Sequence, residues 1–271
     1  DNARVLGLGE TMRFMECCEG EKRMADKLEL FAKKHIDGHA PGIRGKEVQA
    51  YRLAGVENDH ECSTAEEVLD KLRAGLHIYV REGSGAKNLE TLIKTMLDAG
   101  VCLDRCAFCT DDKHVEEIRK EGHISTCIRK AIALGVPVAK AYKMGSYQAA
   151  EFYGLKNYGA IGAGYRADIV FLDDLEQVRP LDVMKDGRIL TEEDYAKDYS
   201  VPVPDELLHT VHVGEVTKEK IRLSCDGKTD VIQMNPHQIV TTHLVEEVPA
   251  ENGYFKSDGV YNKICVVERH G

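Results

Sequence analysis

Acidic and histidine side chains recur directly after five short apolar segments in the N-terminal part of the chain. The residues that stand there are Glu10, His39, His60, Glu61, Glu82, Asp111 and Asp112. Imidazole and carboxylate together form a ligand mixture that suits Zn²⁺, Mn²⁺ or Fe²⁺. A cation held in this way activates water for hydrolysis, and a neighbouring carboxylate carries the proton. The pattern therefore indicates a metal-dependent hydrolase.

A single histidine after a strand is more often a structural residue than a ligand. Two histidines and two acidic residues, each at the same end of a different strand, are harder to explain as surface chemistry. The carboxyl ends of parallel strands surround one common mouth, where function collects. We therefore predict that Glu10, His39, His60 and Asp111 are metal ligands.

The segment up to about residue 154 alternates short apolar runs with amphipathic helical stretches, which is typical of parallel βα units. The predicted strands are residues 5–9, 35–38, 55–59, 77–81 and 105–110. The predicted helices are residues 21–34, 45–53, 65–74, 89–99, 115–134 with a possible split near Gly122, and 138–155. A helix cap stands before the third helix, where Ser63 and Thr64 precede two acidic residues.

The rhythm changes after residue 159, where β structure outside the βα series is expected. We predict a strand over residues 167–172 and a hairpin over residues 183–190 that turns at Asp186-Gly187. A Pro-rich linker, residues 201–204, precedes a second β-rich unit. Its predicted strands are residues 209–213, 220–224, 238–245 and 264–267.

Composition narrows the function classes. The chain has 271 residues, a formal net charge of −10 and no run rich in Lys and Arg, which argues against binding of a nucleic acid backbone. No stretch approaches the roughly 18 to 20 apolar residues of a membrane span, and no signal peptide is recognisable. The nine cysteines fit reduced thiols. We expect a cytoplasmic protein that binds neither nucleic acid nor membrane.

Five ordered motifs resemble the microbial adenine deaminases of the amidohydrolase superfamily. They are Gly7-Leu8-Gly9-Glu10, Asp37-Gly38-His39-Ala40-Pro41-Gly42, Asp59-His60-Glu61, Arg81-Glu82-Gly83-Ser84 and Phe108-Cys109-Thr110-Asp111-Asp112. The resemblance covers essentially the whole chain. It implies strands four to eight of a (β/α)8 barrel in residues 1–158, a small β-sandwich segment in residues 159–200, and the start of a C-terminal β-containing domain in residues 201–271.

The resemblance also implies the site and its reaction. Adenine would be hydrolysed to hypoxanthine and ammonia, with another purine or a cyclic amide as the alternative substrate, by a homo-oligomeric parent protein. Glu10 would bridge two cations, Mn or Fe with Zn possible, His39 and His60 would hold the second, and Asp111 would close the first. Asp111 would also carry the proton, unless Asp112 does. The candidates for gripping the purine are Glu61, Arg81, Glu82, Ser84 and Asp112.

One departure from the family pattern concerns the metal. The family's His-x-His motif at the end of barrel strand one does not occur in this sequence. We therefore expect a chain shortened at both ends, an incomplete metal centre, and no adenine deamination by this polypeptide alone. The unpaired strand edges of such a chain favour association.

Two readings from other functional classes compete with the hydrolase. Cys102, Cys106 and Cys109 have the C-x3-C-x2-C spacing of a radical-SAM iron–sulfur site. In radical-SAM enzymes this motif follows the first strand of the barrel. Here four predicted βα units precede it. A noncatalytic binding module is the other alternative, and it predicts that the four candidate ligands point away from one another.

Overall fold

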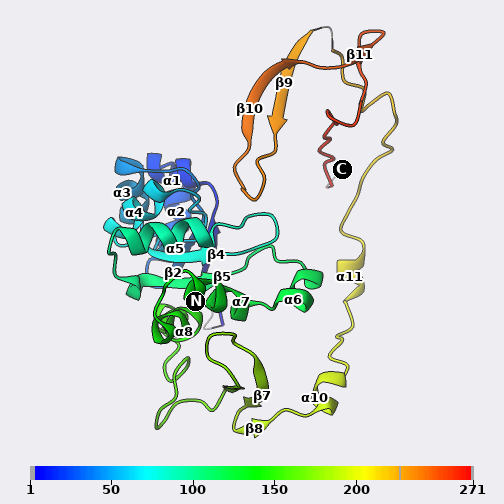
Figure 1. Ribbon diagram of the computed structural model, residues 1–271. Coiled ribbons are helices and arrows are strands. Elements are labelled where there is room, and N and C mark those ends of the chain that lie inside the picture. Colours follow the sequence, from blue (N-terminus) through cyan, green and yellow to red (C-terminus); the bar gives the residue numbers. More distant parts are fainter. Residues whose placement is uncertain (1–3, 226, 270–271) are drawn as a thin grey trace. The chain divides into compact units, whose positions relative to one another are not determined.

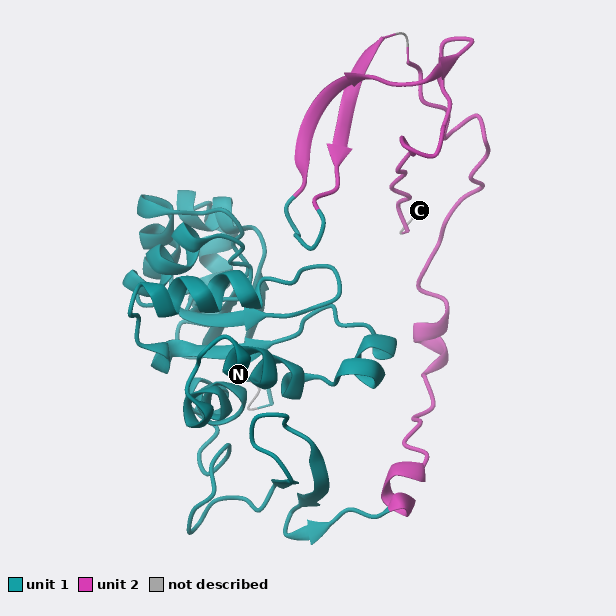
Figure 2. Ribbon diagram, in the orientation of Figure 1, with its two compact units in different colours: residues 1–191, 236–240 teal, residues 192–235, 241–271 magenta. Residues whose placement is uncertain are grey.

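The computed structural model describes residues 4–225 and 227–269 (Figure 1). Two compact units divide the chain (Figure 2). Unit 1 comprises Asp1–Thr191 and Pro236–Val240, and unit 2 comprises Glu192–Asn235 and Thr241–Gly271. The predicted domain boundaries after residues 158 and 200 stay predictions.

Five parallel strands organise unit 1. They are β1 (Gly7–Thr11), β2 (His35–Gly38), β3 (Asn58–Asp59), β4 (His77–Arg81) and β5 (Cys106–Cys109). β1 pairs with β2, and β3, β4 and β5 form a second parallel ladder. The Glu57 amide donates to the Ile36 carbonyl at 3.0 Å, so β2 lies beside β3. The strands thus follow one another in chain order, with their carboxyl ends on the same side, as the predicted series of parallel βα units requires.

Helices connect these strands. They are α1 (Phe14–Glu19), α2 (Lys22–Leu30), α3 (Gly45–Leu53), α4 (Ala65–Arg73), α5 (Leu89–Asp98), α6 (Val115–Glu121), α7 (Ile124–Ala133), α8 (Val138–Gly145) and α9 (Tyr147–Phe152). The predicted split at Gly122 is confirmed, since this glycine has φ 98°. The single helix predicted over residues 138–155 is wrong, because it breaks at Ser146. The Ser146 hydroxyl donates to the Tyr142 carbonyl and competes with the helical ladder.

The core of unit 1 lies between the strands and their helices. Side chains alternate along β4, so Ile78 and Val80 lie on the face that joins the apolar core. Leu92 and Ile93 of α5 belong to the same apolar cluster. The opposite face of β4 carries His77, Tyr79 and Arg81. This alternation is what brings a charged side chain to the end of a buried strand.

An antiparallel sheet ends unit 1. It consists of β6 (Ile169–Leu172), β7 (Pro180–Lys185) and β8 (Arg188–Ile189). Asp186 and Gly187 have φ 51° and 78°, which is the left-handed pair that a tight hairpin turn requires. The predicted strand and hairpin are therefore confirmed here.

Unit 2 contains short helices and two antiparallel pairs. The elements are α10 (Glu192–Ala196), α11 (Asp205–Leu208), β9 (Lys228–Gln233), β10 (Thr242–Glu247), β11 (Ala250–Glu251) and β12 (Tyr254–Phe255). Within residues 4–225 and 227–269, no helix has the length and apolar character that crossing a membrane requires.

Most strand predictions for unit 2 are wrong. Residues 209–213 and 264–267 form no strand, and residues 220–224 contribute only a bridge from Ser224 to Tyr254. The strand predicted over 238–245 begins at Thr242, and β9 was not predicted. Apolar side chains in these segments remain exposed, Val211 by 61% and Val266 by 96%. The alternating pattern therefore did not lead to a strand, because these side chains pack against no apolar surface that the structure describes.

Candidate metal centre

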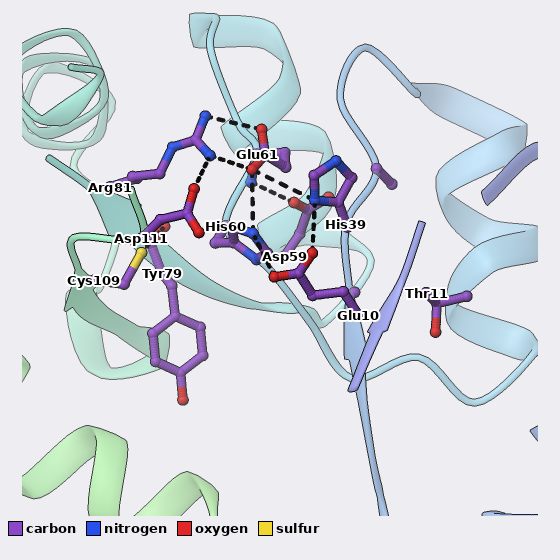
Figure 3. A network of polar contacts seen from close by, with 12 residues as sticks. Glu10, Thr11, His39, Asp59, His60, Glu61, Tyr79, Arg81, Cys109 and Asp111 are labelled. Carbon is purple, nitrogen blue, oxygen red and sulfur yellow. Dashed lines mark hydrogen bonds and ion pairs between the residues drawn. The ribbon is translucent and has the colours of Figure 1, made fainter. Parts of the chain in front are cut away.

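Three of the predicted ligands meet at the carboxyl ends of neighbouring strands. Glu10 lies in β1, His39 follows β2 directly, and His60 follows β3. Their ligand atoms all lie within 4.8 Å of one another (Figure 3). The Glu10 carboxylate is 3.3 Å from His39 Nδ1 and 3.7 Å from His60 Nε2. The parallel strands therefore bring together side chains that are 50 residues apart in sequence.

A second group of possible ligands shares His60. It adds Glu61 and Asp111, again with ligand atoms within 4.8 Å of one another. The Glu61 carboxylate lies 3.2 Å from His60 Nε2 and 3.6 Å from His39 Nδ1. Its side chain is 0% exposed. The sequence places Glu61 among the purine contacts, which stays a prediction, and in the structure its carboxylate contacts the two imidazoles and Arg81.

Arg81 closes the cluster on one side. Both Glu61 oxygens accept hydrogen bonds from its guanidinium, which is 2% exposed. The same guanidinium donates to Asp111 Oδ2 at 2.8 Å. Arg81 thus holds two carboxylates on the β4 side of the cluster (Figure 3).

The donor set of this cluster fits a divalent cation. His39 Nδ1 is buried, faces the Glu10 and Glu61 carboxylates at 3.3 and 3.6 Å, and forms no hydrogen bond within the described part of the chain, so it is available as a ligand atom. Burial lowers the pKa of His60, but the hydrogen bond and charge of Glu61, with the charges of Asp59 and Glu10, outweigh burial and raise that pKa above its ordinary value. The cluster therefore carries an excess of negative charge that a cation would neutralise.

The two adjacent aspartates point to different places. Asp111 has φ 49°, in the left-handed region that Asp tolerates, and its carboxylate reaches Arg81. The Asp112 carboxylate instead accepts a hydrogen bond from the Gly85 amide at 2.6 Å. The structure thus separates two residues that sequence spacing alone left equivalent.

Two further candidates for purine contacts have polar partners of their own. Glu82 forms an ion pair with Lys130 at 2.6 Å. The Ser84 hydroxyl donates to Glu117 at 2.8 Å and accepts from the His114 amide at 2.9 Å. Their proposed contact with a substrate stays a prediction.

The cysteine alternative finds no support in the geometry. Cys102 is exposed and bonds Asp104, Cys106 is buried against Met96, and none of the possible metal-binding groups of the described residues contains a cysteine. The converging ligands also disagree with the noncatalytic module, which predicted that they point apart.

The buried ion pairs behind the cluster were not predicted from the sequence. Lys71 Nζ lies 2.9 Å from Asp59 and 3.7 Å from Glu67, and all three side chains are buried. A signal was present, because Lys71 stands on the apolar face of α4, one turn after Val68. A lysine at such a position needs a buried acidic partner.

Gly38 is required where β2 approaches β3. A Cβ at this position would lie 2.1 Å from the Asn58 carbonyl oxygen and 2.9 Å from Val56 Cγ1. We expect Gly38→Ala to lower the free energy of unfolding by about 1–3 kcal/mol, because backbone must move to admit the methyl group. Urea denaturation measures this change, and displacement of the adjacent His39 should also weaken binding of Mn²⁺.

Gly9→Ala is the matched control, since a Cβ at Gly9 in β1 would meet nothing within 4 Å. Its free energy of unfolding should stay within about 0.5 kcal/mol of the wild-type value. A Gly38→Ala protein as stable as the Gly9→Ala protein would contradict the close approach of the two strands.

Comparison with known proteins finds a family match over more than half of the chain and confirms the expected α/β amidohydrolase-type fold. The amidohydrolase family model matches residues 19–190. The adenine deaminase of Desulfitobacterium hafniense (strain Y51) is 41% identical over 270 residues, which are 99% of this chain and 47% of that protein. Adenine deaminase 2 of Carboxydothermus hydrogenoformans is 39% identical over 100% of this chain and 48% of its own. The chain thus spans about half the length of these curated relatives. A solved amidohydrolase structure is 17% identical, with a TM-score of 0.45, over 61% of this chain and 48% of that chain.

Proposed function

The chain belongs to the amidohydrolase family, and we propose that Glu10, His39 and His60 hold a divalent cation, with Asp111 beside it. The observation that carries this proposal is the convergence of the ligand atoms of Glu10, His39 and His60 within 4.8 Å at one end of parallel strands, and Asp111 shares a second such group with His60 and Glu61. Mn²⁺, Fe²⁺ and Zn²⁺ all accept two imidazoles and a carboxylate. Glu61 is a further ligand candidate, because its carboxylate contacts both imidazoles.

The reaction we propose is hydrolysis of adenine to hypoxanthine and ammonia by the protein to which this chain corresponds. Its support is the name shared by relatives that are 39–41% identical over nearly the whole chain. The water oxygen bonds to the ring carbon that carries the amino group, and the bond from that carbon to the amino nitrogen breaks. When bound, the cation lowers the pKa of water and makes it a nucleophile.

The chain's own residues would handle the protons. Asp111 would accept a proton from water and donate it to the leaving amine, which restores the carboxylate. Arg81 holds the Asp111 carboxylate at 2.8 Å and thereby fixes its direction. Asp112 is bound to the glycine loop and is the weaker candidate for this role.

The finer architecture is part of the same proposal. The five strands in chain order would be strands four to eight of a barrel over residues 1–158, followed by a β-sandwich segment in residues 159–200 and the start of a C-terminal domain in residues 201–271. A complete site would hold two cations. The His-x-His pair absent from this sequence would supply the remaining ligands of the first.

Metal binding by the purified chain tests the proposal. We expect about one Mn²⁺ per chain, because one cluster of three to four ligands is available. Equilibrium dialysis with metal analysis measures this stoichiometry, and a chain that binds no Mn²⁺ at millimolar concentration would overturn the proposed centre.

Asp111→Asn and Asp112→Asn form a matched pair for the proton carrier. In the full-length protein to which this chain corresponds, we expect ammonia release from adenine, measured with Mn²⁺ present, to fall by at least about 100-fold in Asp111→Asn and to change less than about two-fold in Asp112→Asn. The amide keeps the size of the side chain and removes its basicity. Equal losses in the two variants would contradict the assignment of Asp111.

A further inference from the structure

Three buried side chains on the helices behind the cluster contact the segments that carry Glu10, His39 and His60. Tyr51 belongs to α3, and Glu67 and Lys71 belong to α4. All three side chains are excluded from solvent. None is itself among the possible metal-binding groups of the described residues. Their polar contacts explain how separate segments keep a common geometry.

Tyr51 joins the first two ligand segments. Its hydroxyl donates to the Thr11 carbonyl at 3.0 Å and accepts from the His39 amide at 3.0 Å. Thr11 directly follows Glu10. One oxygen atom therefore bridges the His39 amide and the carbonyl of the residue after Glu10.

Glu67 joins the second and third segments. One carboxylate oxygen accepts from the Gly42 amide at 2.5 Å, three residues beyond His39. The other oxygen accepts from the Ser63 and Thr64 amides, both at 3.0 Å, shortly after His60. Of these bonds to the Glu67 carboxylate, only the one from the Thr64 amide belongs to the capping box of α4. The bond to Gly42 is additional, and it ties the helix cap to the neighbouring loop.

Lys71 makes a second connection between the same two segments. Its ammonium group donates to the Ala40 carbonyl at 2.7 Å and pairs with Asp59 at 2.9 Å. Ala40 follows His39 and Asp59 precedes His60. Asp59 in turn accepts a hydrogen bond from the Glu61 amide at 2.6 Å (Figure 3).

We propose that Tyr51, Glu67 and Lys71 form a positioning network that sets the distances between Glu10, His39 and His60. This inference rests on the proposed metal centre. Buried charges are costly, and apolar residues of similar volume serve a fold equally well. The contacts of these three residues go instead to groups within four residues of a ligand, most of them backbone amides and carbonyls, with the Asp59 carboxylate as the partner of Lys71. Groups behind a metal site orient its ligands in this way.

Conservative variants test the network. We expect Tyr51→Phe and Glu67→Gln each to weaken Mn²⁺ binding by about 10- to 100-fold, because supporting contacts of metal ligands have effects of that size. The Phe variant keeps the packing and loses only the shared oxygen. The Gln variant keeps one acceptor oxygen, so it can accept from the Gly42 amide or from the Ser63 and Thr64 amides, but not from both loops. Titration with Mn²⁺ measures the affinity, and the absorption bands of bound Co²⁺ should shift in both variants.

Two matched controls separate positioning from general stability. Tyr142→Phe removes a hydroxyl that donates to the Leu175 carbonyl, away from the ligand segments. Lys71→Met should weaken Mn²⁺ binding to the same extent as Tyr51→Phe and Glu67→Gln. Its control is Lys113→Met, which removes a buried lysine that pairs with Glu121 at 3.2 Å. Both controls should bind Mn²⁺ within about two-fold of wild type. Tyr51→Phe and Glu67→Gln proteins that also bind within two-fold would overturn the network.

Amide hydrogen exchange of the metal-free chain decides the network even if no metal binds. Glu67→Gln should accelerate exchange in two separate peptides, residues 38–44 and 58–65, because it releases both loops. Acceleration confined to residues 61–66 would show that Glu67 only caps α4, and this would overturn its part in the network. If the wild-type chain binds no Mn²⁺ but Glu67→Gln still shows the paired acceleration, the metal centre is overturned and the network is kept.

Discussion

Replacing Arg81 by methionine should lower the free energy of unfolding by about 3–5 kcal/mol, the cost of leaving a buried charge without its partner. Glu61 is 0% exposed and receives both of its strongest contacts from Arg81. Asp111 also loses its partner, but it is 37% exposed, so water replaces part of that contact. Urea or thermal unfolding of the metal-free protein measures the loss.

Two companion variants show whether an unpaired buried charge is the cause. The double variant Arg81→Met, Glu61→Leu removes both charges and should recover most of the lost stability, because a buried pair replaced by apolar side chains is often neutral. Arg44→Met breaks an ion pair with Asp70 in which the Arg44 side chain is 53% exposed. It should lower the free energy of unfolding by no more than about 1 kcal/mol. If Arg81→Met were no more costly than Arg44→Met, the ion pair with Glu61 would not be a closed, solvent-free contact.

The sequence predicted the βα part of the chain well because its signals are local. β2, β4 and α3 have the predicted bounds, and most other elements up to α7 differ by a few residues at their ends, whereas α1 was not predicted. Short apolar runs, caps and left-handed glycines each act over a few residues. A parallel arrangement then brings the strand ends together, which is why ligands could be proposed from spacing alone.

The failures come from interactions that are not local. The helix break at Ser146 depends on a side-chain hydrogen bond to Tyr142, and the strands that failed in unit 2 lack a partner surface. The contact of Glu61 with Arg81 spans 20 residues and needs the register of β3 and β4. The sequence predicted that both residues lie at the carboxyl ends of their strands. Only the structure shows that they pair with each other.

His60→Ala should give the largest loss of metal affinity, by about 100-fold or more for Mn²⁺, since each ligand of a small metal site carries several kcal/mol of the binding free energy. His60 is shared by both groups of possible ligands, so its removal leaves each of them with two members. His114→Ala is the control, because His114 lies on the exposed surface outside both groups. Calorimetric titration of the two variants and the wild-type chain compares the affinities directly. Equal affinity of His60→Ala and His114→Ala would mean that Mn²⁺ binds elsewhere, and the convergence of Glu10, His39 and His60 would then have no bearing on catalysis.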